Sequence, residues 1–204
     1  MSITNITFLL YADSGLTTSA TTSLTVSAFN DLSDGYHDYM FYFGSTDTLQ
    51  KLQATSNPGV DQVVFSPSYI LPARTNSTAY SLGASVIPAT ANGYRYVCTT
   101  AGTTGSTVPT FGTTIGGTTT DGTVVWTLIA ATSSINEIKL SLTSAGLAAA
   151  TAGASLPIGN SLLSGPSNAI QFYMRVTNAV TTISNSSATP ELGLSLNAVV
   201  QSAQ

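Results

Sequence analysis

The sequence predicts an all-β fold, most closely a β-sandwich of the jelly-roll or Ig-like (immunoglobulin-like) kind. Two observations predict it: apolar and polar residues alternate over many short stretches, and threonine and glycine are abundant between them. Threonine is stiff at its first side-chain torsion, and each glycine inside a helix costs about 1 kcal/mol. The one helix-tolerant stretch is Ser144–Ala152, where alanines cluster, and Gly146 and Gly153 limit it to about two turns.

Residues 1–71 predict a meander of short strands joined by polar turns. Half-buried strands are expected where apolar residues share one parity. Such residues are Ile6, Phe8 and Leu10, followed by Leu24, Val26 and Ala28. The run Met40–Phe43 follows, and the turn signal Asn57-Pro58-Gly59 separates strands expected at 49–53 and 62–66.

The same alternation returns after Ser134 and predicts three more strands. The first carries Ile138, Leu140 and Leu142 on one side. The second is Ala169–Val176, with Ile170, Phe172, Met174 and Val176 on one side. The third is Leu192–Val199.

The middle of the chain is rich in threonine, glycine and tyrosine and predicts a small antiparallel β module. Asn92-Gly93 precedes one strand, and Asp121-Gly122 is typical of a two-residue hairpin turn with positive φ. The expected module core is Val86, Tyr96, Cys98, Val124 and Trp126.

These patterns predict a discontinuous domain of residues 1–73 plus 132–204, interrupted by an inserted module at 74–131. Insertions are tolerated at exposed loop tips, where the two ends of the insert lie close together. The competing layout is three successive small units. We prefer the insertion because the few strands on either side of the module would each struggle to close a core.

Composition excludes several classes of partner. Charged residues make up only 7% of the chain and the net charge is −4, with the five basic residues scattered, so a nucleic-acid groove is not expected. No apolar run reaches the roughly 18 to 20 residues of a membrane span. The N-terminus resembles no secretion signal, so we expect synthesis in a cytoplasm. A surface so poor in charge favours self-assembly over a monomer coated in Ser, Thr, Asn and Gln.

Groups suited to catalysis are sparse. His37 is the only histidine, and the neighbouring Asp38 should point to the opposite face of a strand. Cys98 is the only cysteine, so neither an intrachain disulfide nor a cysteine metal site can form. No nucleophile elbow or phosphate loop occurs. We therefore expect no enzyme, no cofactor and no metal.

The stretches "YSLGASV", "NGYRYVC", "AGTTGSTVP" and "DGTVVW" resemble a small β module that is widespread in bacteriophage virion proteins. That module is similar to the carbohydrate-binding modules of chitinases. The resemblance implies a glycan surface built from Tyr80, Tyr94 and Phe111, because sugar platforms need flat, exposed rings. Tyr96 and Trp126 are expected in the core. Where many such modules carry a tryptophan, this chain has Arg74-Thr75-Asn76.

The outer segments resemble small β-rich head-associated proteins of tailed phages. This resemblance implies a capsid decoration (cement) protein at the virion surface, which docks on the major capsid protein or neighbouring virion subunits as a homo-oligomer such as a trimer. The alternative is a tail or fibre component that binds a host surface polysaccharide. A third reading, an intracellular enzyme, would need a pocket around His37.

Overall fold

Nearly all of the regular structure is β in the computed structural model, which describes residues 6–20, 35–132, 134–177 and 192–204. The prediction of an all-β, sandwich-like fold is confirmed. Helical structure in the described ranges is limited to three short 3-10 turns, η1 (Ile135–Glu137), η2 (Ala145–Leu147) and η3 (Pro166–Asn168). The strand expected at Leu24–Ala28 lies outside the described residues.

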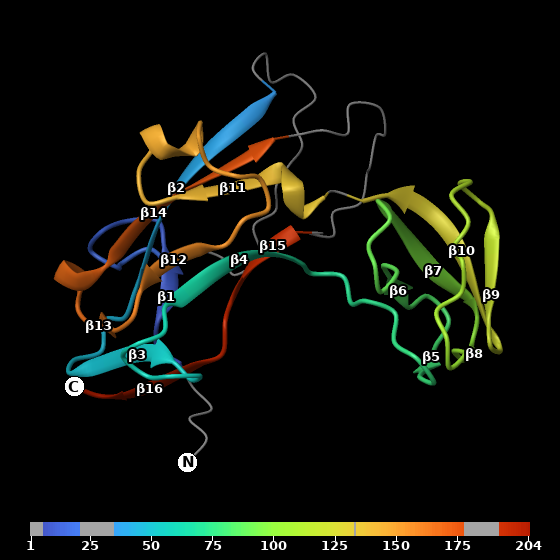
Figure 1. The fold of residues 1–204 in the computed structure, drawn as a ribbon, viewed down its shortest axis with the longest axis horizontal. Helices are drawn as coiled ribbons and strands as arrows, with labels where there is room; N and C mark the ends of the chain where they lie inside the picture. The colour runs from blue at the N-terminus through green and yellow to red at the C-terminus, as the bar shows by residue number, and fades with distance from the viewer. Residues whose placement is uncertain (1–5, 21–34, 133, 178–191) are drawn as a thin grey trace. The chain divides into compact units, whose positions relative to one another are not determined.

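The described chain divides into two compact units (Figure 1). Unit 1 contains the residues up to Ser68, the segment that begins at Ile135, and Leu192–Gln204. Unit 2 contains Tyr69–Ser134, whose strands are green to yellow in Figure 1. The boundaries expected from the sequence, 73/74 and 131/132, lie a few residues inside unit 2.

The described residues of unit 1 form three sheets. Sheet A has the order β1 (Leu9–Tyr11), β2 (Tyr36–Gly44), β14 (Ile170–Thr177), β11 (Ile138–Ser141). Sheet B has the order β12 (Leu156–Gly159), β4 (Val63–Tyr69), β15 (Leu192–Leu196). Sheet C has the order β13 (Leu162–Leu163), β3 (Gln50–Ala54), β16 (Val199–Ala203). In every sheet, strands that precede unit 2 pair with strands that follow it, so neither part forms these sheets by itself.

The core of unit 1 is aromatic and joins sheet A to sheet B. Phe43 of β2 and Phe172 of β14 are buried on sheet A, and Phe65 of β4 is buried on sheet B. The ring centroids of Phe43 and Phe65 are 5.0 Å apart, and those of Phe65 and Phe172 are 4.9 Å apart. The two sheets therefore face each other across a packed layer of rings, as in a β-sandwich.

The strand predictions for unit 1 hold in part. Phe172, Met174 and Val176 are buried on one side of β14, as predicted. β11 ends at Ser141, however, and leaves Leu142 48% exposed. The expected strand 192–199 is instead two strands, β15 and β16, which belong to different sheets. The prediction that Ile6, Phe8 and Leu10 share a buried side is also wrong in part, because Ile6 is exposed while Tyr11 is buried.

Unit 2 contains a four-stranded sheet and a two-stranded ladder. Sheet D has the order β6 (Ser85–Val86), β7 (Tyr94–Thr100), β10 (Val124–Ala131), β9 (Thr118–Asp121). The ladder pairs β5 (Ala79–Tyr80) with β8 (Gly102–Thr103). The pairs β6–β7, β7–β10 and β9–β10 are all antiparallel, as the middle of the sequence predicts.

The turn between β9 and β10 is shifted by one residue from the prediction. Val124 faces Asp121 in the ladder, so Gly122 and Thr123 form the two-residue loop and Asp121 ends the strand. Gly122 has φ +63°, which suits the first position of a type II′ turn. A Cβ atom at this position would also clash with the carbonyl oxygen of Thr103. Glycine is therefore required there by backbone conformation and by space.

Candidate functional site

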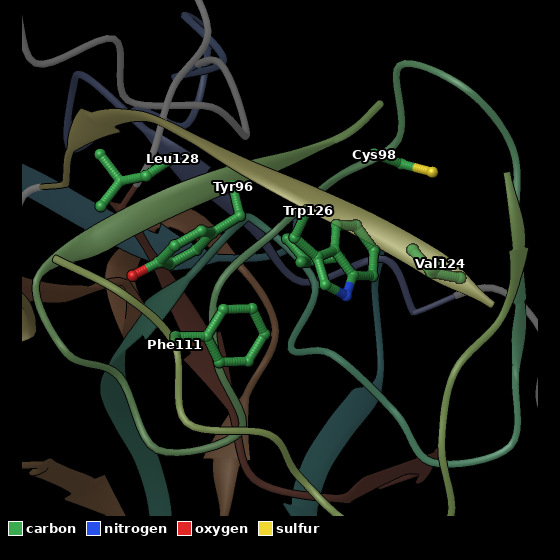
Figure 2. Packing of buried hydrophobic residues seen from close by; sticks show 7 residues of the cluster. Tyr96, Cys98, Phe111, Val124, Trp126 and Leu128 are labelled. Carbon is green, nitrogen blue, oxygen red and sulfur yellow. The ribbon is translucent and has the colours of Figure 1, made fainter. Parts of the chain in front are cut away.

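Apolar residues from three of the four motif stretches of unit 2 form one buried core. Val86, Tyr96, Cys98, Val124 and Trp126 all belong to it, together with Phe111 and Leu128. Figure 2 shows Tyr96 and Trp126 pointing from neighbouring strands toward Phe111. The alternation along β7 and β10 explains this placement, because every second side chain of each strand lies on the same face.

A buried ion pair closes this core on one side. Arg74 Nε donates to Asp121 Oδ2 over 2.8 Å, and Arg74 Nη2 donates to Asp121 Oδ1 over 2.6 Å. The same Nη2 group reaches the carbonyl oxygens of Gly105 (2.8 Å) and Thr107 (3.0 Å), and Nη1 contacts Asn76 Oδ1. The guanidinium therefore connects the start of unit 2, the loop after β8 and the end of β9.

Asp121 accepts two further hydrogen bonds. The backbone N–H of Gly105 donates to Oδ1 over 2.9 Å, and the indole Nε1 of Trp126 donates to Oδ2 over 3.0 Å. Burial by itself would raise the pKa of Asp121, but the hydrogen bonds from Arg74, Trp126 and Gly105 outweigh it and hold the pKa below its ordinary value. The carboxylate is fully engaged, so this centre fixes structure and is not arranged to transfer a proton.

The three rings expected to form a glycan surface differ in exposure. Phe111 is only 8% exposed, with its ring centroid 4.6 Å from that of Tyr96. This burial is a correction to the expected platform, and its cause is the packing of the ring against Tyr96 in the core of unit 2. Tyr80 is half-buried, and its ring centroid lies 4.9 Å from that of Trp126 in an edge-to-face arrangement. Its hydroxyl accepts a hydrogen bond from the N–H of Thr75. Tyr94 is also half-buried and packs on the same core.

The two residues considered for reactivity, Cys98 and His37, belong to different units of the structure. Cys98 is buried in the core, and burial raises the pKa of its thiol, so the thiol stays protonated at neutral pH. His37 is exposed on β2 with its ring against Tyr39 (4.5 Å), and the neighbouring Asp38 pairs with Arg175 instead. In the described ranges, no three His, Cys, Asp or Glu side chains gather as metal ligands would.

Sequence reasoning missed the Arg74–Asp121 centre. Both residues are visible in the sequence, Arg74 as the departure from the module pattern and Asp121 as a turn residue. The signal that could have joined them is the scarcity of charge in this part of the chain, because an isolated charged residue beside apolar strands needs a partner.

Among the described residues, no helix is long and apolar enough to cross a membrane. Comparison of the chain with protein-family models, with curated proteins and with solved structures gives no match.

Proposed function

We propose that this chain is a non-enzymatic structural protein of a bacteriophage virion, a capsid decoration protein that docks on the head lattice and displays unit 2. The observation that supports this most directly is the role of the motif residues. Five positions in the stretches that carry the resemblance to the virion module lie in one buried core: Val86, Tyr96, Cys98, Val124 and Trp126. A motif whose apolar residues build a compact core suits a protein with a structural role.

The surface of unit 1 is consistent with docking. Several apolar side chains on it are well exposed: Leu9, Met40, Leu49, Val60, Leu142 and Leu163. With few charges on the chain, apolar burial at roughly 25 cal/mol per Å² would dominate the binding free energy. Such an interface should resist salt, because screening weakens charge pairs and leaves apolar contacts intact.

The alternative, host polysaccharide binding through Tyr80, Tyr94 and Phe111, has less support. A sugar platform requires exposed rings. Phe111 is buried, and the ring of Tyr80 already packs against the core residue Trp126. Unit 2 therefore presents a poorer platform than the sequence implies.

The proposal is tested on purified particles of the phage that encodes the chain. Electron microscopy should locate this protein on the head lattice, and washing at about 1 M salt, where the Debye length is only about 3 Å, should leave it bound. Density on the tail, absence from the particle, or release in that wash would each contradict the proposal.

A further inference from the structure

The outward face of sheet A carries a strip of aromatic and polar side chains, of which the proposed docking role uses only Met40. The members on β14 alternate with the buried residues Phe172, Met174 and Val176. The members on β2 have the parity that alternates with the buried residues Phe41 and Phe43, so all members lie on the outer face of the sheet. This strip, called the tyrosine strip below, consists of Tyr36, Asp38, Met40, Tyr42, Gln171, Tyr173 and Arg175.

Strand register brings these side chains together in rows. In the β2–β14 ladder, Gln171 lies opposite Tyr42 and Tyr173 lies opposite Met40. Cross-strand neighbours on one face have Cβ atoms about 4.5–5.5 Å apart, close enough for direct contact. The two pairs therefore form one continuous patch of two rings, an amide and a thioether.

Hydrogen bonds hold the central part of the strip in place. Gln171 Nε2 donates to the hydroxyl of Tyr173 over 2.8 Å and contacts the sulfur of Met40 at 2.9 Å. Met40 is nevertheless 43% exposed. Groups that are fixed before a ligand arrives lose little conformational entropy when it binds.

An ion pair continues the strip along the strands. Arg175 Nε and Nη2 donate to the two carboxylate oxygens of Asp38 over 2.7 and 2.8 Å. The guanidinium also lies over the ring of Tyr36, 3.7 Å from its centroid. Asp38 keeps 40% of its side chain exposed, so its carboxylate can still accept bonds from a ligand.

The dimensions of the strip limit what it can hold. From Tyr36 to Tyr42 it runs six strand positions, or about 20 Å, and it is two strands wide, which gives an area of roughly 200 Å². A standard protein interface needs about 800 Å² per partner. The strip by itself is smaller than such an interface, and on the same face it borders Lys139 and Ser141 of β11, which lie opposite Arg175 and Tyr173. Its length along the strands suits an extended chain.

We propose that the tyrosine strip binds an extended oligosaccharide that lies along β2 and β14. The apolar C–H faces of pyranose rings would stack on Tyr42 and Tyr173. Neighbouring sugar hydroxyls would bond to the amide of Gln171 and to the carboxylate of Asp38. The strip combines the flat rings and the few fixed polar groups that such a ligand requires. This inference does not rest on the virion role and holds wherever the protein is located.

The test measures binding of four probes to the full chain by calorimetry and saturation-transfer NMR: maltohexaose, chitohexaose, mannohexaose and a mannuronic acid hexamer. At least one should bind, with saturation transferred from tyrosine ring protons. The double variant Tyr42→Ala and Tyr173→Ala should weaken that binding about tenfold or more. Tyr42→Phe should keep the affinity within about twofold, because the stacking ring remains.

A matched control separates this site from unit 2. Tyr94→Ala removes a half-buried tyrosine of unit 2 and should leave the affinity unchanged, and far-UV circular dichroism checks that each variant folds. Three results would overturn the proposal. These are no binding of any probe to the unaltered chain, binding that survives the double variant, and loss of self-association in the double variant with no sugar binding at all.

Discussion

Arg74 and Asp121 lie 47 positions apart in the sequence and form a two-pronged ion pair whose side chains are 0% and 1% exposed. Another ion pair, Asp38–Arg175, has the same paired geometry but lies on a sheet surface. Removing one partner of a buried pair leaves an uncompensated charge, whereas a surface pair contributes little. The two pairs should therefore differ sharply in their effect on stability.

Asp121→Asn should destabilise unit 2 by about 3–5 kcal/mol, because Arg74 would stay buried without its counter-charge. Trp126 is the only tryptophan and lies in this core, so its fluorescence during urea unfolding reports on unit 2. Asp38→Asn is the control, and its expected cost is at most about 1 kcal/mol by circular dichroism. Equal losses in both variants would contradict the structural role given to the buried pair.

The stability of unit 2 should fall in acid. The folded-state pKa of Asp121 is lowered from its ordinary value of 3.8, so its contribution to stability is fully present above that value. The contribution is lost as the pH falls below 3.8 through the folded-state pKa. An acid titration followed by Trp126 fluorescence should show this loss. In Asp121→Asn that part of the pH dependence should be absent, and an unchanged acid transition would refute the assignment.

Gly122→Ala should destabilise unit 2 more than Gly116→Ala does. Both glycines have positive φ, +63° and +79°, so both substitutions strain the backbone. Only at Gly122 would the new methyl group also meet the backbone of Thr103, because nothing lies within 4 Å of the corresponding position at Gly116. Urea unfolding of the two variants, read at Trp126, compares them directly. Similar midpoints would argue against a steric role for Gly122.

The Cys98 thiol should react with iodoacetamide only when unit 2 opens. It is buried, its pKa is raised by burial, and its sulfur contacts the carbonyl oxygen of Thr100 at 3.2 Å. Reaction in native buffer near pH 8 should be slow and should accelerate in urea in parallel with the Trp126 signal. Fast labelling without denaturant would mean that the core around Cys98 is open.

The strand residues in the core of unit 2 were predictable from local patterns, whereas the burial of Phe111 and the Arg74–Asp121 pair were not. Alternation along 94–98 and 124–128 identifies the inward side chains, because a strand has a period of two residues. Phe111 lies in a segment without regular structure, and no periodicity marks it as buried. The turn at Gly122 is shifted because Asp121 is drawn into the pair with Arg74, a partner that no local pattern reveals.

In unit 1 the positions of the strands were more predictable than the way in which the strands pair. The alternation of apolar and polar residues predicted the buried side of β14 correctly, since Phe172 and Met174 face the core. The pairing of β2 with β14 depends on contacts across the whole chain, which single-sequence patterns do not encode. The tyrosine strip follows from that pairing and for this reason could not be predicted either.

The pairing of β2 with β14 also sets an order of events during synthesis on the ribosome. Asp38 and Arg175 are 137 positions apart, so at about 5–20 residues per second the first strand waits roughly 7 to 27 seconds for the second to be translated. All the strands of unit 2 emerge during that interval. The nascent polypeptide can therefore complete its middle first. Until the last strands arrive, β2, β3 and β4 lack their later partners and keep unpaired edges, which favour aggregation.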